Sequence, residues 1–206
     1  MNCRGHDTRI EIVNKYILFP IAHLQLLNGQ QKKSDAGPII ENDYYIFRLV
    51  NKGNESDVRN IVCGIEAASD FLNLIHHKPL PIFNPLVSGR TEQNINNNSP
   101  SFQNGKINNE TAKQLYNATM WVILIINARI NSPIFKIKNN LEKNMNYEPY
   151  LSIIKSVNTI IKSCFKEKTL SDKINELRKS NNIRNSVCNF SLLQEKLKNV
   201  DITSNF

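Results

Sequence analysis

Residues 109–130 read NETAKQLYNATMWVILIINARI, and this stretch decides the fold that the sequence predicts. Asn109 is a favourable helix N-cap, and the residues that follow are apolar on nearly every face around Trp121. A helix that is apolar all round is buried among other elements. The longest apolar run, 118–126, is nine residues, which is too short to span a membrane. The sequence therefore predicts a mainly α fold, a helical bundle around a buried apolar helix at about 109–130, with a minor β element in the first half.

The first half is expected to carry two helices and one short strand. Apolar residues recur at three- and four-residue steps over 7–27, which predicts a helix that Pro20 kinks. Alternating residues over 44–50 predict a strand. A longer apolar stripe over 56–75 predicts the clearest amphipathic helix of this half, and residues 81–87 are expected to be extended.

Composition divides the chain into three parts. Residues 1–87 form the helical N-terminal part with its short strand, and 88–108 form a flexible Asn-rich loop or linker. Residues 109–206 form a basic all-helical part, which makes one domain or two with the first. Its further helices are expected over 149–168, over 171–179 and from Ser191, where Ser191 and Gln194 have the spacing of a capping box.

The basic charge lies in the second half. Residues 1–100 contain ten Lys/Arg and ten Asp/Glu, whereas 101–206 contain sixteen and eight, so this half carries the whole net charge of +8. At 100° per residue, the helix expected from Pro149 has lysines on one side, and the side expected to be buried carries Ile153, Val157, Ile160 and Cys164. The candidates for an anion-binding surface are Lys155, Lys162, Lys166, Lys168, Arg178, Lys179 and Arg184, which Lys136, Lys138 and Lys173 would extend. The alternative is a solvated helix face in a lysine-rich sequence.

The extended segment 79–87 is the candidate protein contact. Pro79 and Pro81 keep it out of a helix, and its apolar side chains are then available to a partner. These interface candidates are Leu80, Ile82, Phe83 and Leu86. The alternative is that the segment simply covers the core.

Sequence patterns for catalysis and for metal binding are missing. There is no Gly-rich phosphate loop, G-x-S-x-G elbow, H-E-x-x-H motif or EF-hand loop. We interpret His76 and His77 as residues that suit the dipole at a helix end, not as ligands. Cys63 and His76 would lie about 20 Å apart on one continuous helix, too far for a nucleophile and its base. We therefore expect no catalytic residue, no metal and no cofactor.

These observations favour a non-enzymatic helical accessory or adaptor protein that acts through contacts with a protein partner. The four cysteines are widely spaced, which is typical of free thiols and of a cytoplasmic protein. The alternative is a cytoplasmic nucleic-acid-binding protein that uses the basic half without strong sequence readout. An enzyme whose motif is not readable from one sequence is a third hypothesis.

Overall fold

The computed structural model describes residues 1–87 and 109–206, so the loop or linker expected at 88–108 lies outside the described residues. The chain divides into two compact units, Met1–Asn84 and Pro85–Phe206, called here the N-unit and the C-unit. Helices account for 44% of the described residues and strands for 20%. The fold is therefore mixed α/β, and the prediction of a mainly α protein is wrong.

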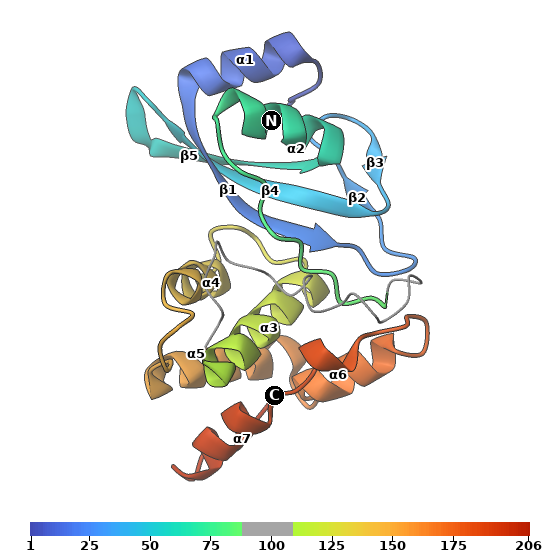
Figure 1. Cartoon of the computed structure of the whole chain (residues 1–206), viewed down its shortest axis with the longest axis vertical. Helices are drawn as coiled ribbons and strands as arrows, with labels where there is room; N and C mark the ends of the chain where they lie inside the picture. The colour runs from blue at the N-terminus through green and yellow to red at the C-terminus, as the bar shows by residue number, and fades with distance from the viewer. Residues whose placement is uncertain (88–108) are drawn as a thin grey trace. The chain divides into compact units, whose positions relative to one another are not determined.

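The N-unit is built on an antiparallel sheet with the strand order β1-β4-β5. Helices α1 and α2 lie on one face of this sheet, and β2 and β3 form a small separate hairpin (Figure 1). Its elements are α1 (His6–Lys15), β1 (Tyr16–Gln25), β2 (Lys32–Lys33), β3 (Ile39–Ile40), β4 (Asp43–Asn51), β5 (Asn54–Gly64) and α2 (Ile65–Leu74).

The helix expected over 7–27 ends at Lys15, and the chain continues as the strand β1. Side chains of β1 alternate between buried and exposed as far as Phe19, and the pairing register with β4 shifts between Pro20 and Ala22. Pro20 lacks an N–H group, which an edge strand tolerates next to such an irregularity. The prediction is wrong beyond Lys15 because pairing with β4 outweighs the helical spacing of the apolar residues.

About half of the helix expected over 56–75 is a strand in the structure. Residues 54–64 form β5, which pairs with β4 from Asn51 opposite Asn54 to Tyr44 opposite Gly64. Only the remainder of the stretch is helical, as α2. The strand expected over 44–50 lies within β4. Val58, Ile61 and Val62 are β-branched residues that suit a pleated strand, and their long-range partner on β4 determines the outcome.

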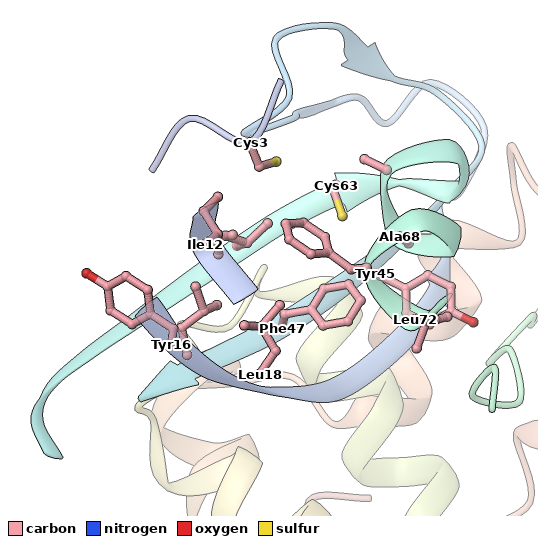
Figure 2. Close-up of a cluster of buried hydrophobic side chains, with 13 residues drawn as sticks. Cys3, Ile12, Tyr16, Leu18, Tyr45, Phe47, Cys63, Ala68 and Leu72 are labelled. Atoms are coloured by element: carbon pink, nitrogen blue, oxygen red, sulfur yellow. The ribbon is translucent and has the colours of Figure 1, made fainter. Parts of the chain in front are cut away.

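The core of the N-unit lies between the sheet and its two helices. Figure 2 shows the buried side chains of this cluster, among them Phe47 of β4. The Phe47 and Phe71 rings lie 5.4 Å apart and neither residue is exposed. At the rim, the Asp70 carboxylate of α2 accepts hydrogen bonds from His6 and Arg9 of α1, so the two helices are joined by charge as well as by apolar contact.

The C-unit is helical and surrounds α3 (Glu110–Ile125), the buried apolar helix that the sequence predicts. The side chain of Asn109 accepts a hydrogen bond from the Ala112 N–H at 2.9 Å, as an N-cap does. Trp121 is completely buried, and α3 contacts most of the other elements of this unit. These are α4 (Pro133–Lys143), α5 (Leu151–Phe165), α6 (Leu170–Leu177), the short 3₁₀ helix η2 (Asn185–Val187) and α7 (Ser191–Lys198).

Two details of these helices differ from the sequence predictions. On α5 the buried side consists of Ile154, Val157, Asn158, Ile161 and Phe165. Ile153 and Ile160 are only half-buried and Cys164 is exposed, so the buried side predicted from them is wrong except at Val157.

The capping box expected at Ser191 is also absent from the structure. Ser191 is the first residue of α7, and its N–H and that of Leu192 donate to the side-chain oxygens of Asn189 and Gln114 at 3.1 and 3.0 Å. A capping box does occur at the start of α6, where Thr169 and Asp172 exchange hydrogen bonds between side chain and backbone.

Candidate functional site

A concavity of about 370 Å³ opens in the N-unit. Its walls are the turn between β2 and β3, the β3 strand with the start of β4, and the first turn of α2. The volume lies within the range of about 300–1,000 Å³ that is typical of binding pockets. The site is therefore built from two segments that are distant in sequence, 34–43 and 64–67.

Two isoleucines at this concavity are exposed. Ile39 is 61% exposed and Ile65 is 39% exposed, whereas Ile40 and Ala67 of the lining are buried. Isolated exposed apolar side chains are common on protein surfaces, but here two of them, from β3 and α2, contribute exposed apolar surface to one concavity. Such a surface favours an apolar group of a ligand.

Three carboxylates, Glu41, Asp43 and Glu66, line the same concavity, and no lysine or arginine does. Glu41 accepts a hydrogen bond from the Gln31 side chain at 3.0 Å. Glu66 lies in the first turn of α2, where a negative charge interacts favourably with the helix dipole. The concavity is therefore acidic as well as apolar.

Asp43 is held by a histidine that is itself fixed at both ring nitrogens. His23 Nε2 lies 2.6 Å from an Asp43 carboxylate oxygen, and Nδ1 lies 3.2 Å from the Leu80 carbonyl oxygen. The ring also stacks on Tyr45, with centroids 4.1 Å apart. These contacts fix the Asp43 carboxylate in place.

The loop that forms one wall is tied to the sheet. The Asp35 N–H donates to the Val62 carbonyl at 2.8 Å, and the Asp35 carboxylate accepts from the Val62 N–H at 2.7 Å. The terminal ammonium of Met1 lies 3.1 Å from the same carboxylate. The wall is therefore held by backbone and side-chain bonds without any ligand, as in pockets that are largely pre-formed.

The seven basic residues predicted as an anion-binding surface all lie in the C-unit. Only Lys168 forms an ion pair among the described residues, with Glu176 of α6. Lys162, Lys166 and Lys179 are exposed without a carboxylate partner in the described chain, and Lys155 is half-buried on α5. Arg178 and Arg184 lie near the same thiol, because the positive charges of both lower the pKa of Cys188.

Lys138, expected to extend this surface, is instead buried. Its exposed fraction is 1%, and its ammonium lies 2.5 Å from Glu142, one turn further along α4. Burial lowers the pKa of Lys138, and the Glu142 charge opposes that shift. This lysine is therefore part of the interior of the C-unit, not of an anion-binding surface.

The predicted interface residues divide between the two units. In the N-unit, Phe83 forms a parallel bridge with Leu24 of β1 and is 3% exposed, and Leu80 packs against the core. Ile82 is half-buried. In the C-unit, Leu86 forms an antiparallel bridge with Ile183 and is also half-buried.

The sequence patterns do not reveal most of the concavity. They show Glu66 and Asp70 as an i, i+4 pair on one helix, whereas Glu66 lines the concavity and Asp70 bonds to α1. The exposed Ile39 follows Gly37 and Pro38 in a short turn, where an apolar residue has no core to join. The position of Ile39 directly after Gly37 and Pro38 is therefore the indication of the concavity that the sequence contains.

No group of three or more potential metal ligands occurs among residues 1–87 and 109–206. In the same ranges no helix is long and apolar enough to cross a bilayer. All four cysteines are free thiols, with Cys3 and Cys63 buried in the N-unit. Burial raises the pKa of Cys3 to about 11 and also raises that of Cys63, which makes both poor nucleophiles.

Comparison with known protein families, with curated proteins and with solved structures finds no match to this chain.

Proposed function

We propose that this chain is a non-enzymatic accessory protein that acts through protein contacts, and that the concavity of the N-unit binds a segment of its partner. The partner segment carries a basic side chain next to an aliphatic one. The observation that supports this proposal is the pairing of two exposed isoleucines with three carboxylates around one concavity without a basic residue.

Both properties of the concavity favour a protein segment of this kind. Covering Ile39 and Ile65 removes apolar surface from water, at about 25 cal/mol for each Å². The Glu41 and Glu66 carboxylates attract a lysine or arginine and repel an acidic partner, which gives specificity and a faster encounter. We place this binding in the cytoplasm, where four free thiols are stable.

Methyl NMR of the full chain labelled at isoleucine tests this function. The probes are a synthetic peptide Leu-Lys-Ser-Leu-Lys-Ser and its counterpart with Glu at each Lys position. We expect the lysine peptide to shift the Ile39 and Ile65 methyl signals, and the glutamate peptide to leave them in place. Ile17, which is 48% exposed on β1 and does not line the concavity, is the internal control.

Two variants and one negative result complete the test. Ile39→Ser weakens binding of the lysine peptide, whereas Ile17→Ser leaves it unchanged. Glu66→Gln weakens it by about two- to fivefold, since an exposed charge pair contributes up to about 1 kcal/mol. Equal shifts with both peptides, or shifts at Ile17 as large as those at Ile39, would refute the proposal.

A second candidate function is nucleic-acid binding by the C-unit without strong sequence readout. It is favoured by the absence of a carboxylate partner, within the described chain, for six of the seven basic candidates. Fluorescence anisotropy with labelled duplex DNA, single-stranded DNA and RNA tests it at low and at physiological salt. Replacing Lys155, Lys162 and Lys166 together by Ser lowers the salt slope by up to about three, one for each phosphate that the variant no longer neutralises. An unchanged slope contradicts this function.

A further inference from the structure

The segment from Leu177 to Gln194 in the C-unit contains no acidic residue and three basic ones, Arg178, Lys179 and Arg184. Arg178 is the C-cap of α6, and Arg184 is the residue before η2. Arg178 and Arg184 are close in the sequence, and the turn between them keeps them close in space. This local excess of positive charge is the starting point for a site that is independent of the concavity in the N-unit.

Hydrogen bonds and charge place the two arginines around one thiol. Arg178 Nη2 donates to the Asn185 side-chain oxygen at 2.8 Å. The Cys188 thiol donates to the Arg184 carbonyl oxygen at 3.2 Å. Cys188 is within reach of the Arg178 side chain and feels the charges of both guanidiniums, which lower its pKa against the larger opposing effect of burial. The Arg178 guanidinium thus lies beside Asn185, which follows Arg184 and begins the η2 helix that ends at its C-cap Cys188.

Arg184 is half-buried and incompletely satisfied. Its Nε atom is buried and has no hydrogen-bond partner among the described residues. Neither Arg178 nor Arg184 forms an ion pair within the part of the chain that the structure describes. Burial lowers the pKa of Arg184, which reflects the cost of its uncompensated charge.

The backbone around these side chains is fixed. The Arg184 N–H donates to the Pro85 carbonyl at 2.9 Å, and the Arg178 N–H donates to the Ile174 carbonyl at 2.9 Å. Trp121 of α3 donates from Nε1 to the Val187 carbonyl at 3.0 Å, which ties η2 to the centre of the C-unit. Both guanidiniums are thus presented from rigid elements, which lowers the entropic cost of binding.

We propose that Arg178 and Arg184 form a binding site for a phosphate group beside Cys188. A guanidinium offers two parallel N–H donors that match an oxyanion, and two of them can engage different oxygens of one phosphate. The half-buried Arg184 guanidinium forms no ion pair among the described residues and can therefore form one with a bound phosphate. Lys179, exposed next to Arg178, adds to the local positive field. The phosphate belongs either to a free small molecule or to a nucleic-acid backbone.

Alkylation of the cysteines by iodoacetamide, followed by peptide-resolved mass spectrometry of the full chain, tests the site. Cys188 is half-buried and reports on it, and Cys164 is exposed on α5 and serves as the internal control. Inorganic phosphate is the first probe, with chloride at the same ionic strength as reference. At about four times the dissociation constant about a fifth of the sites are free, so alkylation of Cys188 slows about fivefold. Alkylation of Cys164 is unchanged.

Variants connect this protection to the two arginines. Arg178 is exposed, so Arg178→Gln leaves the fold intact and removes most of the protection of Cys188. Arg184→Lys keeps the charge but loses the planar donors, and also weakens protection. Lys143→Gln, at an exposed lysine of α4 that is not among the anion-binding candidates, is the matched control and retains full protection.

Two further probes distinguish the possible sources of the phosphate. Three outcomes would overturn the proposal. Protection by inorganic phosphate or by adenosine 5′-monophosphate supports a small-molecule ligand. Protection by single-stranded oligothymidylate alone supports the site with a nucleic-acid backbone as its source. Equal protection by acetate, equal slowing at Cys164, or full protection in Arg178→Gln would each overturn the proposal. None of these results depends on the peptide experiment with the N-unit.

Discussion

In the N-unit nine basic residues accompany nine acidic ones, whereas in the C-unit seventeen basic residues accompany only nine acidic ones. The N-unit uses its carboxylates to join segments distant in sequence, through Asp35 with Met1, Asp43 with His23, and Asp70 with Arg9. The acidic residues of the C-unit mostly pair locally, as Glu142 does with Lys138. The N-unit therefore has equal numbers of basic and acidic residues and uses several carboxylates to connect distant segments, whereas the C-unit has a surplus of positive charge.

The cores of the two units differ in the same way. The N-unit core is assembled from the N-terminal segment, two helices and three strands, each of which contributes a few side chains. The C-unit core depends on one helix, since α3 contacts α4, α5, α6, α7 and η2. A single substitution in α3 therefore affects every neighbouring element at once, which provides the strongest test of the comparison.

The largest effect is expected from Ile123→Asp in α3. Ile123 is 1% exposed, and a carboxylate there has no partner, so its desolvation costs several kcal/mol, comparable to the whole stability of a domain. Trp121 is the only tryptophan and lies in the same helix, so its fluorescence reports on the C-unit alone. We expect the tryptophan emission of Ile123→Asp to be red-shifted and to show no cooperative unfolding transition.

Ile17→Asp is the matched control for this substitution, because Ile17 is 48% exposed in the N-unit. It should change the free energy of unfolding by no more than about 0.5 kcal/mol. If Ile123→Asp keeps a blue-shifted tryptophan emission and a cooperative transition, the C-unit does not depend on α3 and the contrast between the two cores is wrong.

An intermediate effect is expected in the N-unit at alkaline pH. Burial lowers the pKa of Lys32 to about 8, whereas an unfolded lysine titrates near 10.4. Between these values Lys32 binds more protons in the unfolded chain than in the folded one, so its contribution to the free energy of unfolding rises with pH, although the raised pKa values of the buried Cys3 and Cys63 thiols lower the free energy of unfolding over the same range. The ammonium lies 4.3 Å from the centre of the Tyr44 ring, which reduces this gain to about 1–2 kcal/mol.

Urea unfolding of the wild-type chain and of Lys32→Met at about pH 7.5 and about pH 9.5, below the titration of unfolded tyrosines, measures this contribution as the difference between the two chains, in which the cysteine effect cancels. The stability of the wild-type chain relative to Lys32→Met should rise between the two pH values. The same comparison with Lys33→Met should show no rise, because Lys33 is the exposed neighbour on the same strand. An equal result for the two variants would show that another group is responsible.

The smallest effect is expected at the helix caps of the C-unit. Thr169→Ala removes the capping box of α6 and lowers the free energy of unfolding by about 1 kcal/mol. Ser191→Ala should have an effect below about 0.5 kcal/mol, because Ser191 caps nothing in the structure. Chemical denaturation followed by Trp121 fluorescence compares the two variants. An equal loss of unfolding free energy in both variants would mean that the Ser191 side chain caps α7 in solution.

These pairs of residues also indicate what local sequence can predict. Helix α3 was predictable because its apolar content is too high for any position except the interior. The Thr169–Asp172 box was present in the sequence as well, and Ser191 had similar spacing but lies inside its helix. Spacing alone does not distinguish a cap from a first-turn residue.

The strands β1 and β5 were not predictable from spacing because their apolar residues satisfy a helical and an extended pattern together. Their conformation depends on β4, a partner that the pattern does not contain. The concavity has the same origin, since Ile39 and Ile65 meet only after the sheet has formed. The basic surplus of the second half was readable from composition, but the convergence of Arg178 and Arg184 required the turn between them.

The bridge between Phe83 and β1 also has a consequence for the order of folding during synthesis. The Phe83 N–H and carbonyl bond to His23 and Gln25 on the outer edge of the first strand of the chain. Until residue 83 has left the ribosome, that edge exposes unpaired backbone groups, which are a template for pairing with other nascent chains. The last residues of the N-unit thus protect its first strand, and a ribosome that pauses before residue 83 leaves the chain open to aggregation.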